Sequence, residues 1–178
     1  MPKILVTGAT GQIGAELTLA LRERYGAENV IAAGHRREPP GSLAQTGPYV
    51  SLDVCDAAVL DAVVSGQRIT VIYHLAALLS AVAEEQPLQA WDINTNGLLS
   101  VLESARQHSC QVFFPSSIAA FGPGTPPFDT PQDTVQHPST IYGITKVTGE
   151  LLCDYYHRRY GVDARGVRYP GLISNQVL

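Results

Sequence analysis

The sequence predicts an α/β fold built on a doubly wound parallel sheet. Three observations favour this fold class. Short apolar and β-branched runs alternate with helical patterns along the chain, as in consecutive βαβ units. A glycine-rich turn follows the first apolar run directly and precedes a helical stretch. The length of 178 residues fits one domain, and 45% hydrophobic with 16% charged residues is typical of a compact globular protein.

The first unit of the chain combines a strand, a glycine turn and a helix. We expect a buried strand over Lys3–Thr7 and a helix over Leu17–Tyr25. Glycines between them let the backbone approach a pyrophosphate, and the helix N-terminus presents free N–H groups and a positive dipole end. The spacing G-x-x-G-x-x-G is one residue longer than the usual dinucleotide fingerprint, but its position after the first strand supports that function. We therefore expect a Rossmann-type domain whose turn binds a dinucleotide through Gly8, Gly11, Gln12, Ile13 and Gly14.

Five further strands are expected where β-branched and aromatic residues cluster between turn signals. In chain order they are Asn29–Ala33, Tyr49–Leu52, Thr70–His74, Gln111–Phe114 and Asp163–Arg168. With the first strand they make a sheet of at least six parallel strands. The glycine turn is expected at the point where the strand order reverses.

Helices and loops fill the intervals between these strands. A helix over Ala57–Val64 can be capped by Asp56, because a carboxylate accepts from the free N–H groups of a first turn. Two longer helices are expected over Pro87–Gln107 and Ser139–Tyr160. Two segments rich in turn-forming residues are expected to be loops instead of helices: Gly34–Pro48 and Pro123–Pro138.

Charge and cysteine content exclude several classes of function. The net charge is −4, and no basic run exceeds a pair of arginines, so nucleic-acid binding is not expected. No apolar stretch approaches the roughly 18 residues of a membrane span, and Met1 leads straight into a strand without a charged leader. We therefore expect no membrane association and a cytoplasmic protein. The three cysteines form no C-x-x-C motif and are expected to be free thiols, and no metal site is predicted.

The carboxyl ends of the strands should carry the ligand-binding residues, as in other open parallel sheets. The third strand leads to Asp53 and Val54, and the fourth leads to Leu75, Ala76 and Ala77, whose small size allows a flat cofactor to lie against the backbone. Asp53 could accept a hydrogen bond from an exocyclic amine such as that of adenine. A loop carboxylate is as often simply solvated, so both roles remain open for Asp53.

A tyrosine and a lysine four residues apart form a second candidate site. On a helix, Tyr142 and Lys146 share one face, with Cβ atoms about 5–6 Å apart. An ammonium at that distance stabilises a phenolate and lowers the tyrosine pKa from its usual value near 10, which makes the phenol a usable base. Such pairs are also common on solvated helix faces. Ser117 follows the preceding strand and can orient a substrate oxygen, which favours the catalytic interpretation.

These motifs together resemble the extended short-chain dehydrogenases. The similarity extends over essentially the whole chain, through TGATGQIG (Thr7–Gly14), HLAA (His74–Ala77), DINTNG (Asp92–Gly97), FPSSIAAFG (Phe114–Gly122), YGITK (Tyr142–Lys146) and RYPGLIS (Arg168–Ser174). Within that family, the LLSA segment (Leu78–Ala81), FPSSIAAFGP and RYPGLIS are most similar to the L-threonine 3-dehydrogenase group. That group is itself similar in fold to UDP-galactose 4-epimerase.

The resemblance implies a role for each matching residue. Tyr142 would be the catalytic base and Lys146 its pKa-lowering partner and ribose ligand. Ser117 would be the catalytic serine, with its neighbour Ser116 ranked second. Ser80 would contact the substrate together with Ser117 and Tyr142, while Asn94, placed in the cofactor site, would steady the active-site helix unless it is a plain surface amide. The nicotinamide side of the site would be formed by Tyr169, Pro170, Gly171 and Leu172.

Two departures from the family pattern bear on cofactor and domain content. Members that use NAD carry an acid at the end of the second strand, whereas this chain has Gly34, followed by His35, Arg36 and Arg37. NAD is ranked first, and NADP remains open because Arg36 or Arg37 could pair with a 2′-phosphate. The family continues into a smaller substrate domain, and nothing of it follows Leu178. We therefore expect residues 1–178 to be an NAD(P)-binding domain, either a fragment or part of a longer natural chain.

These inferences lead to one expected function and two alternatives. We expect oxidation of L-threonine to 2-amino-3-ketobutyrate by hydride transfer to NAD, by a small-molecule enzyme that forms a homodimer. A nucleotide-sugar epimerase or dehydratase would use the same serine, tyrosine and lysine. The second alternative is a binding module that holds NAD(P) without turnover, because catalysis needs a closed, dry site.

Overall fold

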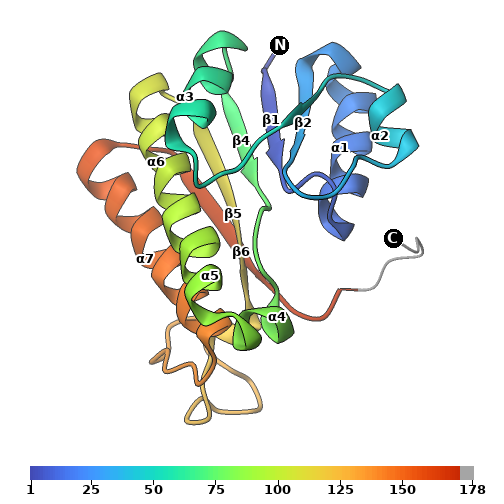
Figure 1. Cartoon of the computed structure of the whole chain (residues 1–178). Coiled ribbons are helices and arrows are strands. Elements are labelled where there is room, and N and C mark those ends of the chain that lie inside the picture. The colour runs from blue at the N-terminus through green and yellow to red at the C-terminus, as the bar shows by residue number, and fades with distance from the viewer. Residues whose placement is uncertain (173–178) are drawn as a thin grey trace.

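A six-stranded, all-parallel sheet forms the centre of the molecule (Figure 1), in a computed structural model that describes residues 1–172. The strand order is β3-β2-β1-β4-β5-β6, so the chain builds outward from β1 on one side and from β4 on the other. The predicted fold class and the position of the glycine turn at the reversal point are both confirmed. The strands are β1 (Ile4–Thr7), β2 (Val30–Gly34), β3 (Tyr49–Ser51), β4 (Val71–His74), β5 (Gln111–Ser117) and β6 (Ala164–Tyr169).

Helices cover the sheet from both faces. Figure 1 shows α1 and α2 on one side and α3, α6 and α7 on the other. The helices are α1 (Gln12–Tyr25), α2 (Gly41–Gln45), α3 (Ala57–Gly66), α4 (Ser80–Glu85), α5 (Pro87–Trp91), α6 (Gly97–His108) and α7 (Ile141–Tyr160), with 3₁₀ turns at Ala27–Asn29 and Ile118–Ala120. No helix within residues 1–172 combines the length and the apolar character needed to cross a membrane.

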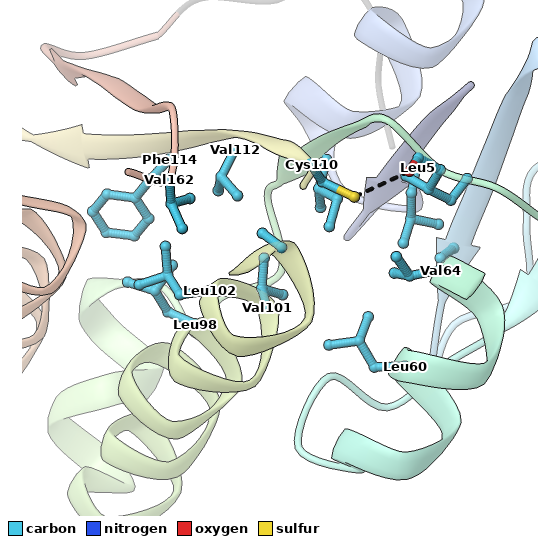
Figure 2. Close-up of a cluster of buried hydrophobic side chains, with 14 of the residues drawn as sticks. Leu5, Leu60, Val64, Leu98, Val101, Leu102, Cys110, Val112, Phe114 and Val162 are labelled. Carbon is cyan, nitrogen blue, oxygen red and sulfur yellow. Dashed lines mark hydrogen bonds between the residues drawn. The ribbon is translucent and has the colours of Figure 1, made fainter. Parts of the chain in front are cut away.

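Strand periodicity explains the two layers of the core. Ile4 and Val6 of β1 point toward the α1 side, whereas Leu5 between them points toward α3 and α6. Because both faces are covered, the central strands are apolar without alternation. Figure 2 shows the second layer, in which side chains of α3 and α6 meet those of β5, and Cys110 Sγ donates to the carbonyl of Ile69 at 3.0 Å.

Several helix boundaries differ from the prediction. Helix α1 begins at Gln12 instead of Leu17, because its first turn grows directly out of the glycine turn. The segment 34–48, predicted to be a loop throughout, contains the short helix α2 after Pro40. The predicted helix over Pro87–Gln107 is present, but a π-helical turn at Asp92–Asn96 separates α5 from α6. Helix α4 was not predicted. The cap at Asp56 is confirmed, since its carboxylate accepts from the N–H of Val59 at 3.1 Å.

A buried arginine ties the α2 segment to the rest of the domain. Arg22 of α1 is only 5% exposed, and its Nη1 donates to the carbonyl of Leu43 at 2.7 Å and to Thr46 Oγ1 at 2.8 Å. Its Nη2 donates to the carbonyl of Pro48 at 2.6 Å, and its Nε donates to that of Val30 at 3.4 Å. Burial lowers the pKa of Arg22. One guanidinium thus donates hydrogen bonds to several oxygen atoms of the segment that leads from α2 into β3.

Replacing Arg22 by alanine should lower the free energy of unfolding by about 3 kcal/mol, because the buried guanidinium that bonds the carbonyls of Val30, Leu43 and Pro48 is lost. Denaturant unfolding measures this loss. Arg24→Ala, on the exposed face of the same helix, is the matched control and should change stability little. Equal stability of the two variants would show that water replaces the Arg22 hydrogen bonds without cost.

Candidate active site

The glycine turn lies directly against the chain that follows β4. Gly8 has a φ of +67°, and a Cβ at this position would lie 2.6 Å from the backbone nitrogen of Ala76. Gly8 is therefore required both for its conformation and for this contact. The carbonyl of Gly8 accepts from the N–H of Gly11 at 3.0 Å, and α1 begins at the next residue without a side-chain cap. Free N–H groups at the start of α1 fit the diphosphate of a dinucleotide.

A buried pair beneath the turn stabilises the same contact. Thr7 and His74 are aligned in the β1–β4 register, and Thr7 Oγ1 lies 3.0 Å from His74 Nδ1. Burial, together with the charge of Lys146, lowers the pKa of His74 to about 3, so the imidazole stays neutral. Thr7 Oγ1 also accepts from the N–H of Ala76 at 3.4 Å. His74 stood out in the sequence only as part of the HLAA motif, and this structural role was not predicted.

The predicted serine, tyrosine and lysine come together at the carboxyl edge of the sheet. Ser117 ends β5, while Tyr142 and Lys146 lie on the first two turns of α7. Thr140 caps this helix, with its Oγ1 accepting from the N–H of Gly143 at 3.0 Å. A hydrogen bond joins the Tyr142 side chain to Ser117, and Lys146 Nζ lies 5.3 Å from the centre of the tyrosine ring. This arrangement can orient an alcohol oxygen and accept its proton.

The direction of the tyrosine pKa shift differs from the prediction. Burial raises the pKa of Tyr142, and only the hydrogen bond with Ser117 opposes this effect. The buried Lys146 Nζ is turned toward the sheet, where it donates to the carbonyl of Pro115 at 2.8 Å. Burial lowers the pKa of Lys146 to about 8. The ammonium thus lies beside the phenol, but the net shift of the Tyr142 pKa is upward, because burial outweighs the hydrogen bond with Ser117.

Asn94 joins three parts of the site. It lies in the π-helical turn between α5 and α6 and is buried. Its Oδ1 accepts from the N–H of Leu78 at 2.8 Å, and its Nδ2 donates to the carbonyl of Leu78 at 3.1 Å and to Thr145 Oγ1 at 3.2 Å. The carboxamide therefore links the chain after β4 to the active-site helix α7. This geometry supports the steadying role implied by the resemblance, not a plain surface amide.

The second-ranked serine belongs to a different network. Ser116 Oγ donates to Glu150 of α7 and is buried, so its hydroxyl is engaged in this network, which favours Ser117 as the serine of the site. Glu150 also accepts from Arg168, with Nη2 at 2.7 Å and Nε at 2.9 Å, and from Gln136 Nε2 at 3.2 Å. Burial acts to raise the pKa of Glu150, but these donors hold it below its ordinary value. Glu150 was not among the predicted site residues. The sequence signal that could have indicated it is its spacing of four residues from Lys146, which places both on one face of the helix.

The remaining predicted residues lie around the same edge. Asp53 is half-buried after β3, where Oδ2 lies 3.5 Å from His35 Nε2 and Oδ1 accepts from the N–H of Cys55 at 3.0 Å. Ser80 is exposed on the first turn of α4. Tyr169 pairs in register with Ser117 at the end of β6. The other predicted positions are Val54, which is buried, Leu75 and Ala77, which are partly buried after β4, and Arg36, Pro170, Gly171 and Leu172, which are exposed. Ile173 and Ser174 of the last motif lie outside the described residues.

Comparisons with known proteins agree with this geometry. The model of the NAD dependent epimerase/dehydratase family matches residues 4–176. A curated relative from Staphylococcus epidermidis, named an uncharacterized epimerase/dehydratase, is 54% identical over 98% of this chain. The chain spans only 55% of that relative's length.

Two solved structures give the same picture. The L-threonine dehydrogenase of Clostridium difficile is 55% identical with a TM-score of 0.95, and the similarity covers 98% of this chain and 55% of that one. A UDP-glucose 4-epimerase from Thermotoga maritima is 28% identical with a TM-score of 0.86, over 93% of this chain and 54% of that one. The resemblance inferred from the motifs is confirmed.

The Glu150 network should stabilise the domain in a pH-dependent way. Glu150→Gln should lower the free energy of unfolding by about 2 kcal/mol at neutral pH, because Arg168 keeps its charge and loses its partner. The pKa of Glu150 is depressed in the fold, so its contribution is present above the unfolded pKa and is lost as pH falls through the folded value.

Urea unfolding at pH 7 and under acid conditions measures this dependence. The difference between the wild type and Glu150→Gln should shrink on acidification. Glu23→Gln on the exposed face of α1 is the control, with no such pH-dependent difference. A difference that is equal at both pH values would contradict the assignment.

Proposed function

Because the chain belongs to the NAD dependent epimerase/dehydratase family, we propose that it oxidises L-threonine to 2-amino-3-ketobutyrate with a nicotinamide dinucleotide. The observation that carries this proposal is the grouping of Ser117, Tyr142 and Lys146 at the carboxyl edge of the sheet, the edge at which the glycine turn follows β1. The 55% identity to an L-threonine dehydrogenase supports threonine as the substrate. The expected homodimer and cytoplasmic location stay predictions.

The residues of the site suit both parts of such a cofactor. The turn from Gly8 to Gly14 and the start of α1 would hold the diphosphate, and the backbone at Leu75–Ala77 would lie against the flat ring system. Lys146 would bind ribose hydroxyls through Nζ. When bound, the nicotinamide ring accepts a hydride from the carbinol carbon of the substrate.

The protein's own residues would handle the substrate oxygen and its proton. The Ser117 hydroxyl would hydrogen-bond the carbinol oxygen and stabilise the charge that develops on it. The phenolate of Tyr142 would take the hydroxyl proton as the C–H electron pair leaves and the carbon–oxygen double bond forms. The ammonium of Lys146, 5.3 Å from the tyrosine ring centre, would stabilise that phenolate. The O–H and C–H bonds of the alcohol are broken and its carbon–oxygen double bond is formed, and the reaction needs no reactant besides the substrate and the dinucleotide.

The same three residues also suit a nucleotide-sugar epimerase or dehydratase. The similarity to a UDP-glucose 4-epimerase supports this alternative, but its 28% identity is about half of that to the threonine enzyme. A module that binds the cofactor without turnover is the third candidate, because the chain spans about half the length of its relatives. Turnover of L-threonine, compared with that of a UDP-hexose, tests these possibilities with the complete natural protein.

Tyr142→Phe should reduce threonine oxidation at least a thousandfold while cofactor affinity stays nearly unchanged, because the ring still packs and only the base is lost. Initial rates and a fluorescence titration with reduced cofactor give the two readouts. Tyr160→Phe at the far end of the same helix is the matched control and should remain fully active. An activity loss below tenfold for Tyr142→Phe would show that another group takes the proton.

A further inference from the structure

We propose that the adenosine end of this dinucleotide site binds a 2′-phosphate, so that the protein takes NADP(H) in preference to NAD(H). This inference rests on the proposed dinucleotide site and concerns the residues that follow β2. On the sequence alone NAD ranked first, and these arginines fell in the segment Gly34–Pro48 that was predicted to be a loop. Three structural observations favour the phosphate-bearing form: the packing around Gly34, the position of Arg36 and the charges of their neighbours.

Gly34 stands where a ribose-binding carboxylate would stand, and the space for its side chain is filled. A Cβ at Gly34 would lie 2.7 Å from Tyr49 Oη and 2.9 Å from Thr10 Cγ2. Tyr49 comes from the neighbouring strand β3 and Thr10 from the glycine turn. The Tyr49 hydroxyl also donates to the carbonyl of Arg37 at 3.4 Å. The acid that accepts hydrogen bonds from the two ribose hydroxyls of NAD is therefore absent, and its place is taken by a neutral hydroxyl.

Arg36 is placed beside this position with its charge uncompensated. Its exposed side chain reaches Gln89 of α5 (with the amide oxygen turned toward it), and Nη2 and Nη1 donate to that oxygen at 2.7 and 3.1 Å. The amide carries no charge, and within residues 1–172 neither Arg36 nor Arg37 forms an ion pair. A guanidinium held by a neutral partner keeps its full attraction for a phosphate and loses little conformational freedom on binding one.

The acidic groups nearby do not cancel this charge. Asp53, which follows β3, has Oδ2 3.5 Å from His35 Nε2 and Oδ1 accepting from the N–H of Cys55, and it forms no ion pair with Arg36 or Arg37. Glu38 is exposed two residues beyond Arg36. The segment from Gly34 to Glu38 thus contains two arginines and a histidine but only one glutamate. A 2′-phosphate would gain charged hydrogen bonds here, whereas the unmodified ribose of NAD would find no carboxylate acceptor at Gly34.

Cofactor binding tests this inference without relying on turnover. The purified protein, with its complete natural chain, is titrated with NADPH and with NADH while nicotinamide fluorescence is followed. We expect NADPH to bind at least tenfold more tightly than NADH, which is the effect of one well-placed charged hydrogen bond. Arg36→Ala should remove most of that difference and leave NADH affinity unchanged. Arg68→Ala, an exposed arginine at the opposite edge of the sheet, should change neither affinity.

A second variant tests the packing at Gly34. Gly34→Asp alone would push against Tyr49 Oη and Thr10 Cγ2, so it is combined with Tyr49→Phe and Thr10→Ser, which remove those two atoms. The triple variant should bind NADH more tightly and NADPH more weakly than the wild type, while Tyr49→Phe combined with Thr10→Ser should keep the wild-type ratio. Thermal unfolding of each variant checks that it is folded.

The possible outcomes separate this inference from the proposed function. NADH binding as tight as NADPH, or an Arg36→Ala variant that weakens both cofactors alike, overturns the phosphate assignment. Threonine oxidation that then proceeds with NAD leaves the proposed function standing. Failure of both cofactors to bind overturns the dinucleotide site itself and with it the proposed function.

Discussion

The close approach of two backbones at Gly8 is the constraint on which the rest of the site depends. The absence of a Cβ lets the turn after β1 lie against Ala76 after β4, at the point where the strand order reverses. The Thr7–His74 pair stabilises that contact from below. As a result the start of α1, the end of β4 and the end of β5 lie at the same carboxyl edge of the sheet.

One face of helix α7 carries three ionisable side chains. Tyr142, Lys146 and Glu150 recur every four residues and meet three different environments. The phenol bonds to Ser117, the ammonium donates to the carbonyl of Pro115, and the carboxylate pairs with Arg168. A buried lysine without a carboxylate partner is costly, and the strong backbone hydrogen bond offsets part of that cost. The lysine can therefore stay charged beside the tyrosine at neutral pH.

Polar side chains position the irregular segments around the sheet. Arg22 donates hydrogen bonds to backbone carbonyls between α2 and β3. Asn94 pairs with the backbone of Leu78 and also donates to a side chain of α7. Each is buried and has several partners, so its loss leaves groups unpaired that cannot reach water. The π-helical turn at Asp92–Asn96 is part of this arrangement, because it contains the asparagine whose carboxamide meets Leu78. Segments without regular structure are thus ordered by hydrogen bonds more than by apolar packing.

Much of the fold could be predicted from the sequence because its signals are local. Apolar strands, the glycine turn, the Asp56 cap and the Tyr142–Lys146 spacing depend on neighbours within a few residues, and the parallel order follows from their alternation with helices. The matching motifs also identified Ser117. Short elements such as α2 and α4 were missed, because helices of five or six residues have too little periodicity to recognise.

What only the tertiary structure decided concerns contacts between residues distant in the chain. Ser117 ranked above its neighbour Ser116 on the motif match, and the fold separates their surroundings: Ser116 bonds to Glu150, and Ser117 bonds to Tyr142. Burial by the whole domain raises the pKa of Tyr142 and outweighs the opposing hydrogen bond with Ser117. The space beside Gly34 is filled by Tyr49 from another strand. Desolvation and close packing are properties of the assembled molecule, and for this reason residue spacing along the chain could not determine them.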